Sequence, residues 1–434
     1  MMSRLTTMLS LAGLLAGVAA FAQEGGRVVT LAEALETARK NQPQLEIARA
    51  NTSAAEARAK GARAPLLPQV SAYASYSRQT HNPTGAGGQP VATDPSFDTV
   101  NYFSVGAGAS QLVWDFGSKL GRYRAAQTAA DAQREGEASA DREVVFAVRA
   151  AFFVAVADKA FVAIAADSLA AHQRHLEQVG GFVAAGARPE IDLAQLRADV
   201  ANARLSLVRA ETAYASAKAA LNQTMGVAGP TGYDVADDQL VPVEAEDAPE
   251  EALVATAADG RPELKALETR AEAIRRQIAA TKGDYWPILG VSTGVSDAGT
   301  ELQNLAWNWH ATASLTWPIF QGGVTRAAVQ ELEAEHLAAQ AEIDAMKLAI
   351  RTDVAAARLG IAGAKAEIAA SEAVVESARE TLRLAEARYQ AGAGSIIELQ
   401  DAQTALTNAE GQAVQAEFGL SLARARLLAA IGRD

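Results

Sequence analysis

The chain contains no cysteine, which excludes disulfides, thiolate metal sites and an acylated N-terminal cysteine. Aromatic residues make up only 6% of the 434 residues, whereas alanine is abundant, and this composition favours long uninterrupted helices. Basic residues are in the minority: the net charge of −12 argues against nucleic acid and anionic lipid as partners.

A long apolar run occurs only near the N-terminus, from Leu9 to Ala20. Arg4 before the run and Ala20-Phe21-Ala22 at its end are typical of a secretory signal peptide, so we predict a signal peptide at residues 1–22. The alternative is a retained membrane anchor, which the shortness of the run disfavours. A secreted chain with no other apolar helix is periplasmic, extracellular or a membrane β-barrel.

The sequence contains an internal duplication. Apolar and small residues recur at alternating spacings of three and four, which is typical of the buried stripe of a long helix. They are Leu399, Ala402, Leu406, Ala409, Ala413, Ala416, Leu420, Ala423 and Leu427. The same stripe runs from Leu193 to Leu221, an offset of 206 (399 minus 193). The repeats are predicted at residues 23–226 and 261–434, joined by a linker at 227–260.

Each repeat is predicted to supply a long antiparallel helical hairpin, at about 118–225 and about 324–431. A shorter helix begins near Leu31, where Thr30 and Glu33 form a capping box, and breaks at Pro43. The linker contains nine Asp or Glu and no Lys or Arg between residues 227 and 259, which indicates a solvated equatorial segment that packs against the helices at mid-height.

Each repeat also contains a predicted β-hairpin, at about 66–114 and about 285–320. From Trp307 to Ile319 apolar residues alternate with polar ones, as in a strand with two unlike faces. The ten steps from Trp307 to Trp317 give roughly 33 Å of strand, or ~23 Å of height at the tilt of a membrane barrel. The aromatics predicted to face lipid are Phe103, Trp307, Trp309 and Trp317. The alternative, a soluble sandwich, would need a partner sheet for three tryptophans.

Four strands cannot close a barrel, and an open sheet edge is not tolerated in lipid, so strands of several chains must combine. Three chains would give twelve strands and six helical hairpins. The fold predicted is an α+β membrane protein with a duplicated unit of β-hairpin plus long antiparallel helical hairpin. It forms a trimeric 12-stranded barrel and an α-helical periplasmic tunnel.

The order and duplication of these parts resemble the TolC family of outer-membrane efflux proteins over nearly the whole mature chain. The motifs that carry the resemblance are Leu67-Pro68-Gln69-Val70, Trp114-Asp115-Phe116-Gly117, Phe320-Gln321-Gly322-Gly323 and Arg388-Tyr389-Gln390-Ala391-Gly392. The resemblance implies the homotrimeric exit duct of a tripartite efflux or type I secretion system, which exports drugs or polypeptides. It implies a location in the outer membrane, in contact with its lipid and extending into the periplasm.

The implied partners are a periplasmic adaptor and an inner-membrane transporter of the resistance-nodulation-division or ABC class. Neither catalysis, nor a cofactor, nor a metal is implied. The alternative function is a non-conducting periplasmic coiled-coil adaptor or scaffold, and the alternating tryptophan strand favours the channel over it.

The resemblance also implies roles at the hairpin turns. Glu398 and Asp401, spaced i and i+3, match acidic positions at the TolC aperture, where a trimer would gather six carboxylates. The alternative is a solvated first helical turn, where acids favour the helix dipole. Asp192 and Tyr389 match a polar contact that holds the closed tip. The adaptor-docking turns implied are Gly186, Ala187, Gly392 and Ala393.

Two further positions are notable. The family's closing arginine falls at Gly394 here, while Arg188 occupies the equivalent place in the first repeat, so the lock is expected to be altered. His172 and His175 lie i and i+3 on a helix, but with no third ligand visible we expect surface residues rather than a metal site.

Overall fold

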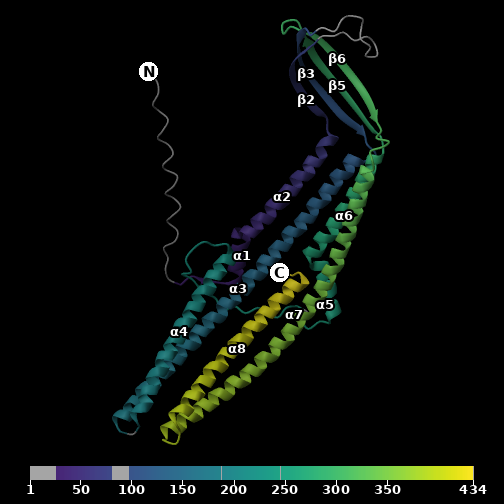
Figure 1. The fold of residues 1–434 in the computed structure, drawn as a ribbon. Coiled ribbons are helices and arrows are strands. Elements are labelled where there is room, and N and C mark those ends of the chain that lie inside the picture. The colour runs from purple at the N-terminus through teal and green to yellow at the C-terminus, as the bar shows by residue number, and fades with distance from the viewer. Residues whose placement is uncertain (1–25, 81–96, 187, 245, 434) are drawn as a thin grey trace, which may run out of the picture. The chain divides into compact units, whose positions relative to one another are not determined.

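The computed structural model describes residues 26–80, 97–186, 188–244 and 246–433 (Figure 1). The predicted signal peptide lies outside the described residues. The chain divides into two compact units. We call Met1–Leu45, Ala140–Gly260 and Ile350–Asp434 the turn unit, because it contains both helical turns, and Glu46–Ser139 and Arg261–Ala349 the strand unit.

Two short helices open the described chain. α1 (Leu31–Asn41) is capped by Thr30, whose hydroxyl accepts a hydrogen bond from the Glu33 amide at 3.2 Å. Gln42 has extended backbone angles, and α2 (Pro43–Arg63) then begins with proline, which lacks the amide that a continuous helix would need. The predicted start and break are confirmed.

The helical hairpins repeat with equal lengths. α3 (Ser118–Ala184) and α7 (Val324–Gln390) have 67 residues each, and α4 (Glu190–Met225) and α8 (Ile396–Ile431) have 36 each. Both returning helices end at a glycine in the left-handed region, Gly226 and Gly432. Every residue of the predicted α4 and α8 stripes is buried or half-buried, which confirms the periodicity argument. Among the described residues, no helix is long and apolar enough to span a bilayer.

The turn unit has an apolar core beside a small parallel ribbon. β1 (Val28–Val29) pairs with β4 (Asp234–Val235), so the start of the described chain is fastened to the acidic segment. Val29 and Val235 pack with Phe152 and Phe153 of α3 and Leu221 of α4. All five side chains are at most 4% exposed.

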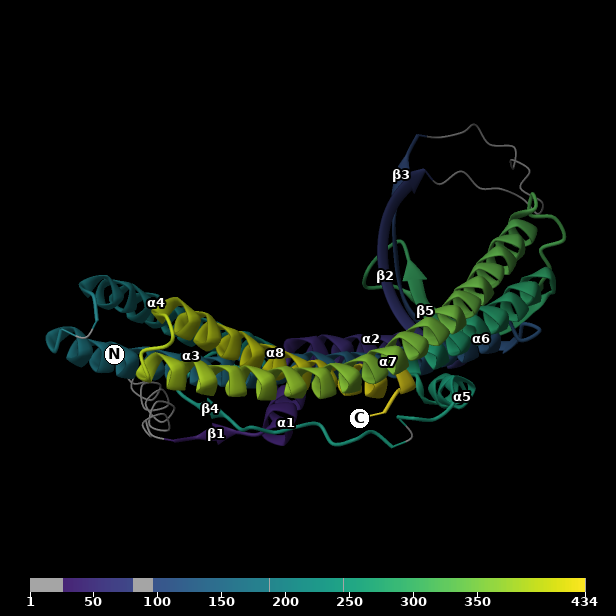
Figure 2. The ribbon, with the colours of Figure 1, turned by 90° about the horizontal axis from the view of Figure 1, so that it is seen from below.

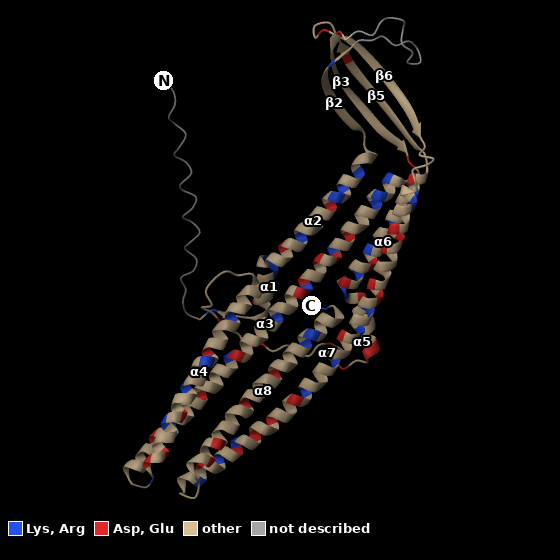
Figure 3. Ribbon diagram, viewed as in Figure 1, with Lys and Arg blue, Asp and Glu red and all other residues tan. Residues whose placement is uncertain are grey.

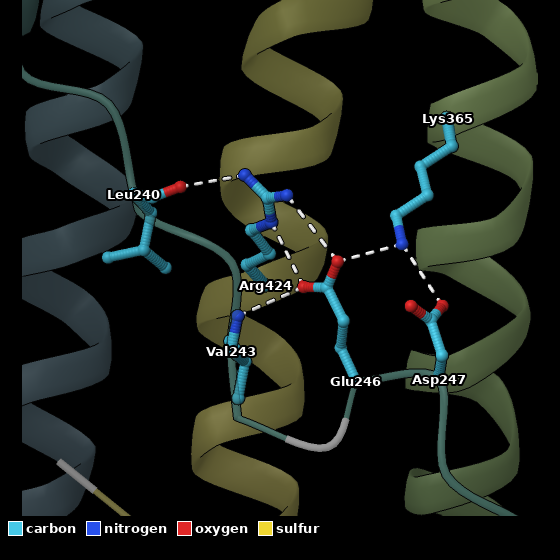
Figure 4. Close-up of polar contacts among 6 residues, drawn as sticks. All are labelled: Leu240, Val243, Glu246, Asp247, Lys365 and Arg424. Carbon is cyan, nitrogen blue, oxygen red and sulfur yellow. Dashed lines mark hydrogen bonds and ion pairs between the residues drawn. The ribbon is translucent and has the colours of Figure 1, made fainter.

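The acidic segment packs against the helices, as expected, and it is more ordered than a linker that is only solvated. It contains β4 and α5 (Glu250–Gly260), and the Glu246 side chain is only 7% exposed. Figure 4 shows Glu246 between Arg424 of α8 and Lys365 of α7, at 3.1 and 2.7 Å. Its basic partners come from other parts of the chain, so the composition of the segment alone cannot reveal them.

The strand unit contains α2, α6 (Pro262–Lys282) and one antiparallel sheet. Short 3₁₀ turns, η1 (Ala64–Leu66) and η2 (Gly283–Tyr285), lead into the hairpins. The strand order is β2-β3-β5-β6, and the bounds are β2 (Gln69–Thr80), β3 (Thr99–Trp114), β5 (Ile288–Gly299) and β6 (Ala306–Thr316). The two hairpins therefore join through β3 and β5, and β2 and β6 form the edges.

The strands carry very little charge. Figure 3 shows them almost free of acidic and basic residues, and within the four strands only Arg78 and Asp297 are charged. The sheet bends strongly, as β3 shows in Figure 2. Small residues leave room on one face: a Cβ at Gly106 would lie 2.9 Å from the Tyr73 ring, and one at Gly294 would lie 2.9 Å from His310.

Candidate functional site

The two helical turns have matched geometry within the turn unit. Gly186 and Gly392 have φ angles of 73° and 75°, a region that favours glycine and lets each helix end sharply. After the second turn, Ser395 caps α8 by accepting a hydrogen bond from the Glu398 amide at 3.1 Å. Ala393 donates its amide to the Arg388 carbonyl at 2.9 Å. Ala187 lies outside the described residues.

One apolar cluster joins the ends of the two hairpins. It combines residues from all four long helices: Val179, Leu196, Ala385, Tyr389, Ile396, Leu399 and Ala402. Tyr389 is only 2% exposed. Because both hairpins contribute, loosening either turn will disturb the packing of the other.

Tyr389 is held by a residue of the other hairpin. The Arg188 guanidinium lies 4.4 Å from the centre of the Tyr389 ring and donates a hydrogen bond to the Tyr389 carbonyl at 2.9 Å. The phenol oxygen is buried without a hydrogen-bond partner among the described residues. Burial raises the pKa of Tyr389; Arg188 opposes the change, and the buried Asp192 carboxylate adds to it.

At Tyr389 the neighbouring guanidinium comes from the first turn. Arg188 contacts Tyr389 directly, which the sequence comparison of the two turns did not indicate. A side chain at position 394 is also disfavoured, since a Cβ on Gly394 would lie 3.0 Å from the Tyr389 amide nitrogen. The backbone leaves little room for an arginine at position 394, and Arg188 supplies a guanidinium instead.

The two predicted aperture acids lie in the first turns of α8. Glu398 is half-buried and lies 3.4 Å from Nε of Arg388, whereas Asp401 is exposed. The Arg388 contact offsets part of the negative charge of Glu398. Asp401 is therefore the more available carboxylate of the two.

The paired histidines are not surface residues, contrary to expectation. His172 and His175 are both half-buried between helices of the turn unit. His175 lies 3.7 Å from Glu386, and His172 lines a polar groove with Asp199 and Gln400. Burial lowers the pKa of both histidines, although Asp199 and Glu386 oppose it. Among the described residues no cluster suited to a metal ion occurs.

The sheet has one apolar and one polar face, as its register shows. Opposed residues share a face in an antiparallel sheet, and Tyr76 lies opposite Phe103 while Val295 lies opposite Trp309. The apolar face collects the aromatic, valine, leucine and alanine residues, namely Val70, Ala72, Ala74, Tyr76, Phe103, Val105, Ala107, Ala109, Leu289, Val291, Val295, Trp307, Trp309, Ala311, Ala313 and Leu315. The opposite face is mainly serine, threonine and glycine.

The aromatics predicted to face lipid lie on or next to this apolar face. The Phe103 ring lies against the Tyr76 ring at a tilt of 36°, with ring centres 5.1 Å apart, and Trp307 and Trp309 are 74% and 63% exposed. Trp317 follows β6 and donates its indole N–H to the Tyr285 carbonyl at 3.1 Å.

A second aromatic cluster lies where the strands meet the helices. Phe116 stacks on Trp286 at 5.3 Å and meets Trp114 edge-on at 6.0 Å. Phe116 has a φ angle of 54°, which is strained for a large side chain, and its counterpart Gly322 has 63°. Sequence reasoning singled out the motif but assigned Phe116 no role, since ring stacking between repeats has no local signal.

A family model of outer membrane efflux proteins matches residues 34–227 and 253–433. The chain belongs to the outer membrane efflux protein family. As a member of this family it is a transport protein of the outer membrane and not an enzyme, which confirms the channel interpretation over the scaffold.

Curated relatives of this outer membrane efflux protein cover most of its length. It is 28% identical to the pyoverdine export outer membrane protein OpmQ of Pseudomonas putida, over 93% of this chain and 85% of that one. It is 26% identical to protein CyaE of Bordetella pertussis, over 93% and 84%.

Solved structures share the fold. The VceC outer membrane protein of Vibrio cholerae superposes with a TM-score of 0.77 at 20% identity, over 93% of this chain and 96% of that one. The CmeC outer membrane channel of Campylobacter jejuni gives 0.78 at 18% identity, over 93% and 85%. The predicted α+β duplicated fold is therefore confirmed.

Proposed function

We propose that this outer membrane efflux protein is the exit duct of a tripartite efflux or type I secretion system, assembled as a homotrimer. The observation that carries the proposal is the four-stranded sheet with one apolar face and two unpaired edges, β2 and β6. Such edges are not tolerated in a bilayer, so the sheet must continue into further copies. Three copies supply twelve strands, enough for a barrel that encloses a channel.

In this assembly the apolar face contacts outer-membrane lipid. We assign Phe103, Trp307, Trp309 and Trp317 to the bilayer interface, which aromatic rings favour, and the exposure of the three tryptophans supports this assignment. The low charge of the strands supports this assignment, because charge on the lipid face destabilises a barrel: β3 and β6 carry no charged residue, and β2 and β5 carry one each.

The turn unit carries the gate. Three copies of Glu398 and Asp401 form an acidic ring, and Asp401 contributes most of its charge because Arg388 offsets Glu398. Tyr389 and Asp192, with Arg188 over the phenol ring, hold the two hairpins together at rest. Opening the duct requires that this cluster be loosened.

The turns themselves dock the partners. Gly186, Gly392 and Ala393 lie at the sharp reversals between helices and, together with Ala187 as the sequence predicts, would meet a periplasmic adaptor. The adaptor links the duct to an inner-membrane transporter of the resistance-nodulation-division or ABC class, and the cargo is a drug or a polypeptide.

Single-channel recording in planar bilayers tests the duct and its ring together. The wild-type trimer should conduct, prefer cations and be blocked by divalent or trivalent cations, increasingly so at low salt. Glu398→Ala/Asp401→Ala should conduct without cation block. The control Glu372→Ala/Glu376→Ala removes two exposed acids from α7 and should keep the block. No conductance in either the wild type or the loosened variant Arg188→Ala would refute the duct, and a double variant with wild-type block would place the ring elsewhere.

A further inference from the structure

The internal duplication preserves the register of the sheet. Val70 lies opposite Ala109 in the first hairpin, and Leu289 lies opposite Leu315 in the second. Equivalent residues in the first strands of the two hairpins are thus 219 residues apart (289 minus 70), and equivalent residues in the second strands are 206 apart (315 minus 109). The other end obeys the same offsets, since the pair Tyr76 and Phe103 becomes Val295 and Trp309.

One junction between hairpins is visible within the chain. The second strand of the first hairpin, β3, pairs with the first strand of the second hairpin, β5. In this junction Val105 lies opposite Asp297 and Ala109 lies opposite Thr293. The two edges of the sheet are also one strand of each kind: β6 is the second strand of its hairpin, as β3 is, and β2 is the first strand of its hairpin, as β5 is (Figure 1).

We propose that β6 of one chain pairs with β2 of a second copy in the register that the duplication dictates. Each β3–β5 pair of the visible junction predicts one β6–β2 pair between copies. Adding 206 to the number of the β3 residue gives the β6 residue, and subtracting 219 from the number of the β5 residue gives the β2 residue. Ala311 then lies opposite Arg78 of the second copy, and Leu315 lies opposite Ala74 of the second copy. The inference rests on the proposed assembly of copies and adds the residue pairs between β6 of one copy and β2 of the next, which we call the seam.

The chemistry of both faces agrees with this register. Ala313 and Leu315 meet the apolar Tyr76 and Ala74, which continues the apolar face across the seam. On the other face Ser314 meets Ser75, and Thr312 meets Ser77. A shift by one residue would place each apolar side chain among polar ones, so only shifts by an even number compete. Among those, the duplication selects one.

The two strand charges also occupy equivalent places. Arg78 corresponds to Asp297 (297 minus 219), which sits opposite Val105 at the visible junction. In the proposed seam Arg78 lies opposite Ala311 and diagonal to Trp309. A guanidinium diagonal to an indole ring is within reach of a cation–π contact, and this contact exists only between copies.

Cysteine cross-linking tests the register without background, since the chain has no cysteine. Ser75→Cys/Ser314→Cys and Ser77→Cys/Thr312→Cys place cysteines directly opposite across the seam. Exchanged pairs, Ser77→Cys/Ser314→Cys and Ser75→Cys/Thr312→Cys, use the same four substitutions but lie about 7–8 Å apart, beyond disulfide reach. Within one chain β2 and β6 are separated by two strands, so no pair can close internally.

After mild oxidation of intact cells, the two directly opposite pairs should move most of the full-length chain to covalent dimer and trimer positions on non-reducing gels. The exchanged pairs and single-cysteine variants should stay monomeric under denaturing conditions. Efficient cross-linking of an exchanged pair instead would overturn the register while leaving the trimer intact. No cross-link in any pair, with trimers still seen by light scattering, would overturn the β6–β2 seam. No cross-link and a monomer in light scattering would refute the proposed assembly as well.

Discussion

Replacing Glu246 by alanine should destabilise the turn unit far more than replacing Glu244 by alanine. Both carboxylates belong to the acidic segment and lie 3.1 Å from an arginine, Arg424 and Arg433 respectively. The Glu246 and Arg424 side chains are 7% and 13% exposed, whereas those of Glu244 and Arg433 are 87% and 49% exposed. The two variants remove the same charge at the same distance from an arginine, and they differ in burial and in the further contacts that Glu246 makes with Lys365 and the Val243 amide.

The expected magnitudes follow from burial. Removing one partner of a buried ion pair costs about 3–5 kcal/mol, because the other charge stays buried, while an exposed pair contributes about 0–1 kcal/mol. Arg424 would retain the Leu240 carbonyl at 2.8 Å, and Lys365 would retain Asp247 at 3.0 Å. We therefore expect about 3 kcal/mol for Glu246→Ala and under about 1 kcal/mol for Glu244→Ala.

Thermal unfolding of the purified chain in detergent, followed by circular dichroism, measures the difference. At about 2–4 °C per kcal/mol, Glu246→Ala should lower the midpoint by about 6–12 °C and Glu244→Ala by under about 4 °C. Equal shifts for the two variants would refute the argument from burial.

The same pair predicts a pH dependence. Burial alone would raise the pKa of Glu246, but hydrogen bonds from Lys365 and Arg424 outweigh it and lower that pKa from 4.5. A carboxyl with a lowered folded-state pKa stabilises above the unfolded value and loses this contribution as the pH falls through the folded value. The gap between wild type and Glu246→Ala should therefore be constant from neutral pH down to about 5 and shrink below 4.5. A gap that does not shrink would contradict the ionic origin of the contact.

Three further outcomes are expected. Ala313→Asp should block membrane assembly, since a charge on the lipid face costs roughly 2–3 kcal/mol, whereas Ser314→Asp on the opposite face should be tolerated; equal trimer yields in outer-membrane fractions would show that the faces are assigned wrongly. Arg188→Ala should raise single-channel conductance by removing a cation–π contact of about 0.5–1 kcal/mol and a charged hydrogen bond of about 1.5–3 kcal/mol. Arg188→Lys should resemble Arg188→Ala, because lysine lacks the planar fork, and unchanged conductance in both would place the closing contact elsewhere. Burial lowers the pKa of His175, with Glu386 opposing, so packing near the turns should weaken as the pH falls below 6.5. Proteolysis at the α3–α4 turn should then rise between pH 7 and 5.5, and a His175→Gln variant with the same rise would exclude this histidine as its source.

The sequence by itself determined the repeated architecture. The spacing of three and four along α8 and its copy in α4 sets which residues face inward on any helix, so the buried stripes could be predicted without coordinates. Alternation from Trp307 to Leu315 fixes the two faces of β6 in the same way. Gln111 is a polar residue in line with the apolar face, and its amide donates hydrogen bonds to the Leu66 and Leu112 carbonyls near the strand end.

Only the tertiary structure decided the contacts between distant segments. Arg188 reaches Tyr389 across 201 residues, and Glu246 reaches Arg424 across 178 residues. Periodicity reports which side of its own element a residue occupies, but not which element lies opposite. For this reason sequence reasoning did not give the partial burial of the histidines, the ion pair between Glu246 and Arg424, or the contact of Arg188 with Tyr389. In each case a neighbouring segment supplies the burial or the opposite charge, which no local spacing encodes.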